Sequence, residues 1–197
     1  MQQQSLFETS FPRGLSYQPE FLDREQEAKL VEQIRTLPLQ NSKYKEYTAR
    51  RRTASFGYSY DFSENVAQPA PPPPGFLVEL QNRIAAWVGL RSSEFVQVLV
   101  SEYQPGVPLG WHRDVPDFET IVGLSLASAA RLRFRPYPWR PELRKRVFAL
   151  DVEPRSIYAL RGEARWGWQH SVPPVPQLRY SITFRTGRAR VQTEPHG

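Results

Sequence analysis

Apolar residues recur at helical spacing in two stretches of the N-terminal half of the chain. Apolar positions three and four residues apart over residues 28–37 predict an amphipathic helix. Asp23 precedes this stretch as a candidate N-cap, and Gln26, three residues later, completes the spacing of a capping box. A second apolar stripe over residues 76–88 predicts another helix that ends near Gly89. Because an amphipathic helix buries one face, both are expected to pack against a sheet.

From residue 95 onwards the pattern changes to short strands. Segments rich in β-branched and aromatic residues, separated by turn residues, are residues 95–103, 110–114, 121–126, 131–135, 146–152, 156–160, 168–172 and 178–185. Many short strands with this spacing are typical of an antiparallel sandwich, barrel or jelly roll. With the two helices, the pattern predicts a mostly β chain of the α+β class, while residues 1–18 are expected to form an irregular lead-in.

Residues 43–62 combine basic and aromatic side chains. The cations are Lys43, Lys45, Arg50, Arg51 and Arg52, and the aromatic residues Phe56, Tyr58, Tyr60 and Phe62 then alternate. Alternation predicts a strand with one aromatic face, in which Gly57 permits a bulge or a close backbone approach. This face either packs on the core or belongs to a lid that places cations on phosphates and stacks a ring on a base. The proline-rich residues 66–75 are expected to be extended.

The composition indicates a globular chain with a basic surface. The 197 residues are most simply one domain, and 40% of them are hydrophobic. The formal net charge of +6 comes largely from arginine, which indicates either a polyanionic partner or simply a basic solvated surface. The absence of cysteine excludes disulfides, zinc fingers and thiol catalysis. Neither a membrane span nor a secretory leader is evident, so a cytoplasmic protein without membrane contact is expected.

A His-x-Asp motif carries the first chemical signal. His112 and Asp114 are two residues apart, so on a strand their side chains project from the same face and can bind one metal ion. Only two other histidines exist, and His196 is the penultimate residue of the chain. His170 is therefore the main candidate for a third ligand. Two histidines and one carboxylate make a facial triad, which leaves three metal positions free for substrates and oxygen.

Polar residues occupy one face of the final predicted strand. Arg179, Ser181, Thr183 and Arg185 share that face and alternate with apolar or aromatic residues. If the face looks into a barrel, two guanidinium groups are aimed at an enclosed anion such as a dicarboxylate, which arginine binds bidentately. The alternative is an ordinary edge strand whose arginines lie in water.

A second arginine series occupies an earlier predicted strand. Arg131, Arg133 and Arg135 alternate there on one face. They either extend a basic groove or form an ordinary solvated face, and the sequence leaves both readings open.

Three blocks of the chain together resemble the AlkB family of Fe(II)- and 2-oxoglutarate-dependent dioxygenases. The first block has Tyr103 and Gly106 ahead of His112-Arg113-Asp114. The second is the segment Gly162-Glu163-Ala164-Arg165 that leads to His170, and the third is RYSITFR at residues 179–185. Their order and spacing agree with the family over about residues 50 to 186.

The resemblance implies a cofactor set and the residues that bind it. The Fe(II) ligands would be His112, Asp114 and His170. The 2-oxoglutarate site would consist of Tyr103, Arg179, Ser181, Thr183 and Arg185, with Arg179 on the distal carboxylate and Arg185 near the metal-bound end. The implied fold is a double-stranded β-helix, or jelly roll, with its core at about residues 95–186 and a nucleotide-recognition lid at about residues 45–75, within one domain over residues 1–197.

The activity implied by the resemblance is oxidative demethylation of N-alkylated bases in nucleic acid, most simply in DNA repair, with O2 as cosubstrate. The sequence does not determine the oligomeric state, for which a monomer is the simplest expectation. Candidate substrate contacts are Arg50, Arg51, Arg52, Phe56, Tyr58, Tyr60, Arg113 and Trp168. Ser101 and Pro116 depart from residues common in the family, which leaves the substrate open. The alternatives are an RNA or tRNA base, a protein side chain or small molecule, or a non-catalytic nucleic-acid-binding module.

Overall fold

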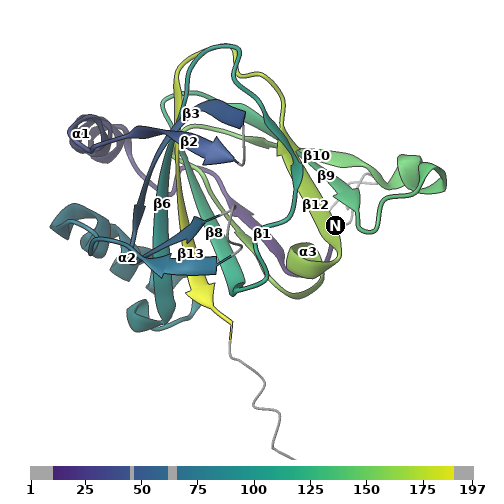
Figure 1. Ribbon diagram of the computed structural model, residues 1–197, viewed down its shortest axis with the longest axis horizontal. Coiled ribbons are helices and arrows are strands. Elements are labelled where there is room, and N and C mark those ends of the chain that lie inside the picture. The colour runs from purple at the N-terminus through teal and green to yellow at the C-terminus, as the bar shows by residue number, and fades with distance from the viewer. Residues whose placement is uncertain (1–10, 45–46, 62–65, 189–197) are drawn as a thin grey trace, which may run out of the picture.

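Two antiparallel sheets face each other in the computed structural model, which describes residues 11–44, 47–61 and 66–188 (Figure 1). The larger sheet has seven strands in the order β1 (Leu15–Gln18), β11 (Ile157–Leu160), β8 (Phe118–Leu126), β13 (Arg179–Gly187), β6 (Phe95–Tyr103), β3 (Tyr47–Phe56) and β2 (Gln40–Tyr44). The smaller sheet has four, in the order β10 (Phe148–Val152), β9 (Ala130–Pro136), β12 (Trp168–Val172) and β7 (Leu109–His112). This arrangement confirms the predicted jelly roll.

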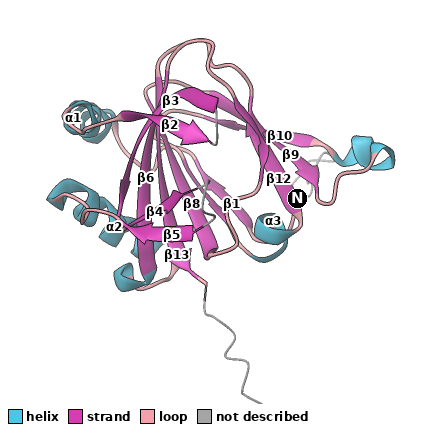
Figure 2. Ribbon diagram, viewed as in Figure 1, coloured by secondary structure: helices cyan, strands magenta, loops and turns pink. Residues whose placement is uncertain are grey.

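Two helices cover the outer face of the larger sheet, as the amphipathic patterns predict (Figure 2). Helix α1 (Arg24–Arg35) begins with a capping box in which Asp23 and Gln26 exchange hydrogen bonds. Helix α2 (Gly75–Val88) ends at Gly89 in the left-handed conformation, with φ of 67°, which glycine adopts without strain. No helix in the described ranges combines the length and apolarity needed to cross a membrane.

A second apolar layer lies between the two sheets. Phe134 and Leu132 from β9 meet Ile121 and Leu160 from the larger sheet in this layer. Strand β13 separates the two layers, because its Tyr180, Ile182 and Phe184 pack towards the helices. Its alternate residues therefore face the smaller sheet, which is the inward orientation that a buried anion site requires.

Short connecting elements complete the chain. They are α3 (Gly162–Trp166), the two-stranded sheet of β4 (Tyr58–Asp61) and β5 (Val66–Pro69), and the 3-10 helices η1 (Ser92–Glu94) and η2 (Pro141–Arg146). The helix η2 replaces the start of the strand predicted at residues 146–152. The predicted irregular lead-in is wrong for residues 15–18, which form β1 and pair with β11. Four residues are too few for a readable alternation.

The predicted aromatic strand is divided into two. Strand β3 extends the larger sheet beside β6 and ends at Phe56, whereas β4 begins at Tyr58 and pairs with β5. Between them, Gly57 has a φ of +76° and exchanges backbone hydrogen bonds with Ala70 and Pro71. The expected close backbone approach at Gly57 is confirmed. Residues 45–46 and 62–65 of the expected lid, and with them Phe62, lie outside the described residues.

We expect Gly57→Ala to lower the free energy of unfolding by at least about 2 kcal/mol, because it combines left-handed strain with a backbone clash. A Cβ atom at this position would lie 2.3 Å from the carbonyl oxygen of Val96. Urea unfolding measures the change. The matched control is Gly75→Ala, which meets open space at the start of α2 and should alter stability by less than about 0.5 kcal/mol. Equal stability of the two variants would contradict this role for Gly57.

Candidate metal centre

His112, Asp114 and His170 converge on one point between the sheets. His112 on β7 and His170 on β12 are direct partners in adjacent antiparallel strands, with ring centroids 4.3 Å apart. One ligand atom from each of the three residues lies within 4.8 Å of the others. Strand β7 ends at His112, so Asp114 lies in the following loop and not on the strand that the sequence predicts. A contact other than strand alternation therefore orients the carboxylate.

That contact is an ion pair with Arg185. The Nε and Nη2 atoms of Arg185 donate to Oδ1 of Asp114 at 2.8 and 2.6 Å. The other carboxylate oxygen, Oδ2, lies 3.6 Å from Nε2 of His170. Burial alone would raise the pKa of Asp114, but the charge of Arg185, with those of His170, His112 and Arg165, together outweighs it and holds that pKa below its usual range. Asp114 is therefore ionised at neutral pH.

A buried arginine fixes the loop that carries Asp114. The Nη2 atom of Arg165 donates to the backbone carbonyl groups of Asp114, Val115 and Phe118 at 3.1, 2.8 and 2.9 Å. Its side chain comes from α3, and Arg165 is five residues before His170. Arg165 therefore connects the segment of the third candidate ligand to the loop of the second. It orients the site without facing the ligand atoms.

Both histidines present a neutral nitrogen to the site. Burial lowers the pKa of His112, and burial with the nearby His112 lowers the pKa of His170 to about 3, although Asp114 acts in the opposite direction. The Nδ1 atom of His112 lies 2.9 Å from the carbonyl oxygen of Gly110. A carbonyl only accepts, so Nδ1 carries the proton and Nε2 keeps its lone pair.

These donors fit a divalent cation. The Oδ2 atom of Asp114 is buried and has no hydrogen-bond partner among the described residues, which would be costly without a ligand. Two neutral imidazoles and one carboxylate on a common face form the ligand set of non-haem Fe(II) oxygenases, with positions left open for substrates. The metal that the sequence predicts therefore has its ligands in place.

A second buried cation lies on the inward face of β13, at the start of the strand. Arg179 is 2% exposed and is paired with Tyr103 across β13 and β6. Its Cζ atom lies 5.1 Å from the centroid of the Tyr103 ring, and its Nε donates to Oγ of Ser125 at 3.2 Å. No carboxylate pairs with Arg179 in the described part of the chain. A buried, unpaired guanidinium is suited to an anionic ligand.

The remaining predicted residues of β13 share its inward face. Ser181 is buried opposite Ser101 and Ser125, and Thr183 lies opposite Gly123. Arg185, the second inward arginine, uses its third nitrogen to donate to Gln97. The structure therefore brings all four polar residues of this strand to the face that also holds the triad.

Two neighbours of Arg179 were not found from the sequence. Burial raises the pKa of Tyr158 to about 12, opposed by the nearby Arg179, so its phenol keeps its proton. Its ring lies over Gly123, where any Cβ atom would come within 2.2 Å of Cζ. Ser125 supplies the hydroxyl that fixes Arg179. These contacts join β8 to β11 and β13, and no local spacing reveals such a pairing.

The basic cluster divides between the two faces of β3. The Cζ atom of Arg51 lies 5.7 Å from the Tyr103 ring centroid, and Nη1 lies 3.5 Å from the Tyr103 hydroxyl. Arg52 instead forms two hydrogen bonds with Glu102, at 2.7 and 2.8 Å. A carboxylate of the fold therefore compensates the charge of Arg52, whose role as a phosphate contact stays a prediction. The side chain of Arg50 lies outside the described residues.

The predicted aromatic contacts also divide. Phe56 is buried in the cluster beneath the helices, so its prediction as a stacking residue is wrong. The turn at Gly57 separates it from Tyr58, which is 41% exposed, and from Tyr60, which is half-buried. Burial, followed by the charge of Asp117, raises the pKa of Tyr60. Among the described side chains of this segment, Tyr58 and Tyr60 therefore offer accessible rings.

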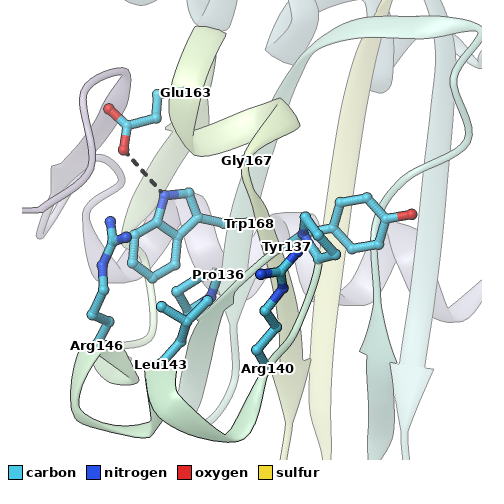
Figure 3. A pocket seen from close by; sticks show the side chains of 9 residues that line it. Pro136, Tyr137, Arg140, Leu143, Arg146, Glu163, Gly167 and Trp168 are labelled. Carbon is cyan, nitrogen blue, oxygen red and sulfur yellow. Dashed lines mark hydrogen bonds between the residues drawn. The ribbon is translucent and has the colours of Figure 1, made fainter.

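Arg113 and Trp168 make their contacts with aromatic rings and a backbone carbonyl. Arg113 places its Cζ atom 3.5 Å from the centroid of the Tyr137 ring and donates to the carbonyl of Trp166. Trp168 is buried against Phe148 and lines a cavity of about 410 Å³ (Figure 3). None of the triad residues lines this cavity. The ring of Trp168 packs in the apolar layer between the sheets, and its role as a substrate contact stays a prediction.

Comparison with known proteins agrees with this geometry. The family model of the 2OG-Fe(II) oxygenase superfamily matches residues 14–188. The chain is 27% identical over 195 residues to an uncharacterized protein of Acanthamoeba polyphaga mimivirus, a match that covers 87% of this chain and 84% of that protein.

Two further comparisons concern AlkB homologues. The chain is 27% identical over 169 residues to the tRNA (carboxymethyluridine(34)-5-O)-methyltransferase ALKBH8 of Macaca fascicularis, covering 83% of this chain but 24% of that protein. It therefore spans about a quarter of the length of this relative. The solved structure of OsALKBH1 has the same fold, with a TM-score of 0.67, 15% identity and coverage of 88% of this chain and 96% of that one. The chain belongs to the 2OG-Fe(II) oxygenase superfamily, whose members use Fe(II) and 2-oxoglutarate, and within it the chain is AlkB-like.

Proposed function

We propose that this protein is a dioxygenase that oxidises an N-alkyl substituent on a base of nucleic acid. The observation that carries the chemistry is the orphaned Oδ2 of Asp114 between two neutral histidines, with the unpaired guanidinium of Arg179 on the adjoining sheet. This pairing of a metal site and an anion site suits a metal and an organic diacid bound side by side. When bound there, Fe(II) with 2-oxoglutarate and O2 supplies the oxidant that hydroxylates a C–H bond, and succinate and CO2 leave.

Each residue has a separate part in this proposal. His112, Asp114 and His170 hold the metal, and Arg185 keeps Oδ1 of Asp114 occupied so that Oδ2 faces the metal. Arg179 binds the distal carboxylate of 2-oxoglutarate, next to the hydroxyl groups of Ser125, Tyr103 and Tyr158. Ser181 and Thr183 line the same face. Because a hydroxylated N-methyl group breaks down to formaldehyde and the free amine, the base leaves the site without its methyl group.

Charge and aromatic surface support a nucleic-acid substrate. The chain carries a net charge of +6, and Arg51 lies close enough to His112 to lower its pKa. Tyr58 and Tyr60 offer accessible rings, and Arg113 is held over Tyr137. A base must leave its stack before its substituent can reach a buried metal, and rings with adjacent cations stabilise it in that position. The name of the ALKBH8 relative also includes tRNA, which makes RNA as well as DNA a substrate to test.

We expect the protein, given Fe(II) and 2-oxoglutarate, to release formaldehyde and succinate from oligonucleotides that contain 1-methyladenine or 3-methylcytosine. Mass spectrometry of matched DNA and RNA oligonucleotides detects the loss of one methyl group and separates the two substrates. His170→Ala should reduce turnover by at least about 100-fold. Loss of a residue that only hydrogen-bonds to a metal ligand already lowers metal affinity or activity by up to about 100-fold, and loss of the ligand itself should cost at least as much. Succinate formation without loss of any base substituent would sink the demethylase assignment. A complete lack of succinate would favour a non-catalytic binding module.

Arg179→Gln should raise the KM for 2-oxoglutarate at least about tenfold, because the distal carboxylate loses a charge-assisted contact. Binding of Mn(II) in place of Fe(II), followed by calorimetry, should be unchanged in this variant, since Arg179 does not touch the triad. Ser59→Ala on β4 is a control that should leave both values unaltered. An unchanged KM for Arg179→Gln, with Mn(II) binding intact, would remove this arginine from the cosubstrate site.

The stability of the metal-free protein should depend on pH through His170. The pKa of this residue is about 3 in the folded state, against 6.5 ordinarily, so between these values the unfolded chain binds the additional proton. Stability is therefore complete above about pH 6.5 and falls towards pH 3, by up to about 1.4 kcal/mol per pH unit for this one group. Denaturant unfolding of chelator-treated protein measures the slope. His170→Asn should flatten it, and an equally steep slope in that variant would contradict the assignment.

A further inference from the structure

The outer face of the smaller sheet carries the arginine series on β9. Leu132 and Phe134 point inwards and are buried, so Arg131, Arg133 and Arg135 lie on the opposite face. This sheet lies away from helix α1, which covers the larger sheet (Figure 1). The outer face is therefore on the side of this sheet opposite its apolar inner layer, and the short helix η2 contacts β9.

Two of these arginines are held by uncharged partners. The Nε atom of Arg133 donates to Oγ of Ser171 at 3.1 Å, and the Nε atom of Arg135 donates to Oε1 of Gln169 at 2.7 Å. Neither forms an ion pair with another described residue. By contrast, Arg131 lies 3.9 Å from Asp151. Arg133 and Arg135 are thus fixed in place while their charge stays uncompensated.

Tryptophan rings also contact these two guanidinium groups. The Cζ atoms of Arg133 and Arg135 lie 5.1 and 4.6 Å from the centroid of the Trp111 ring, and Arg135 is also 5.4 Å from Trp139. Cation–π contacts of this kind restrict the long side chains. A preorganised guanidinium loses less conformational entropy when it binds a phosphate, and its planar fork matches two phosphate oxygens.

The face leads directly to the metal centre. Trp111 and His112 are consecutive residues on β7, which is the edge strand of the smaller sheet. Because strand side chains alternate, His112 points to the metal site while Trp111 points to the outer face. A polymer that crosses this edge can place one unit at the metal and the next units over Trp111. A linear polyanion with repeated phosphates suits such a path, and its bases can also contact the indole rings.

Positive charge continues past the end of β9. Arg140 and Arg146 line the cavity of Figure 3, in which Glu163 is the one carboxylate among the lining residues. That carboxylate already accepts a hydrogen bond from Nε1 of Trp168, drawn as the dashed line. These two arginines add positive charge near the end of β9.

We propose that the outer face formed by Trp111, Arg133, Arg135 and Trp139 binds the phosphate backbone of the nucleic acid whose base occupies the metal site. This arginine–tryptophan face rests on the proposed function for its partner, yet it makes no contact with the reacting group. It supplies affinity that is independent of the modified base, and it sets the direction in which the strand leaves the site.

The test compares two doubly substituted proteins that lose the same charge. Arg133→Gln with Arg135→Gln removes the face, whereas Arg24→Gln with Lys29→Gln removes two exposed cations of α1 on the other side of the molecule. Fluorescence anisotropy with an unmodified, labelled single-stranded oligonucleotide gives Kd over a series of salt concentrations. The slope of log Kd against log salt should decrease by about 1.4 for the face variant, at about 0.7 for each lost phosphate contact. The α1 variant should keep the slope of the unsubstituted protein.

Three other results would contradict the proposal that this face binds phosphate. These are an unchanged slope in the face variant, an equal loss in the α1 variant, or tighter binding of poly-glutamate than of the oligonucleotide. Succinate formation without nucleic acid serves as a check that the face variant is folded and should equal that of the unsubstituted protein. If the predicted slopes are found but no modified base is oxidised, the proposed function is wrong, while the assignment of the face as a nucleic-acid-binding surface is supported. If both doubly substituted proteins oxidise bases with the same KM for the oligonucleotide, the assignment of the face is wrong and the proposed function is retained.

Discussion

The ion pair between Asp114 and Arg185 is the contact on which the metal centre depends. A carboxylate in a loop would otherwise be free to turn both oxygens towards any donor, but Arg185 occupies Oδ1 twice and leaves Oδ2 beside His170. Arg165 then fixes the backbone of the same loop through three carbonyl groups. Removing one partner of a buried pair of this kind typically costs about 3–5 kcal/mol, because the other charge stays buried without compensation. Binding of a metal and stability of the loop are therefore coupled through one carboxylate.

Strand β13 connects this carboxylate to the rest of the fold. Its Tyr180, Ile182 and Phe184 pack beneath the helices, and the alternate residues include Arg179 and Arg185 on the inner face. A shift of register by one residue would bury the arginines among apolar side chains and turn the aromatic residues to the metal. The apolar packing of α1 and α2 therefore stabilises the one register in which both guanidinium groups face inwards. Hydrophobic burial and the placement of charge are two results of the same alternation.

What the sequence predicts well is whatever depends on residues close together along the chain. The capping box of Asp23 and Gln26, the left-handed end of α2 and the two faces of β13 all follow from local spacing. Contacts between distant strands do not. Tyr158 reaches the anion site only because Gly123, on a neighbouring strand, has no side chain where its ring lies. Likewise the positive φ of Gly57 divides an alternating pattern into two strands, and an alternating sequence does not report the backbone angle that interrupts it.

The hydrogen-bond partner of an arginine distinguishes a structural role from a ligand-binding role more clearly than its position in the sequence does. Arg52 lies on a strand beside other cations, but Glu102 accepts hydrogen bonds from its Nε and Nη2 atoms, so a carboxylate of the fold compensates its charge. Arg179, Arg133 and Arg135 instead donate to neutral oxygens of serine or glutamine. Those hydrogen bonds fix the direction of each guanidinium without cancelling its charge. The buried Arg179 is costly to hold without a carboxylate unless an anion from outside the chain pairs with it, and an organic diacid supplies that anion. On the outer face water solvates Arg133 and Arg135, so a polyanion is favoured there for a different reason: guanidinium groups that are already oriented lose less conformational entropy when they bind phosphate.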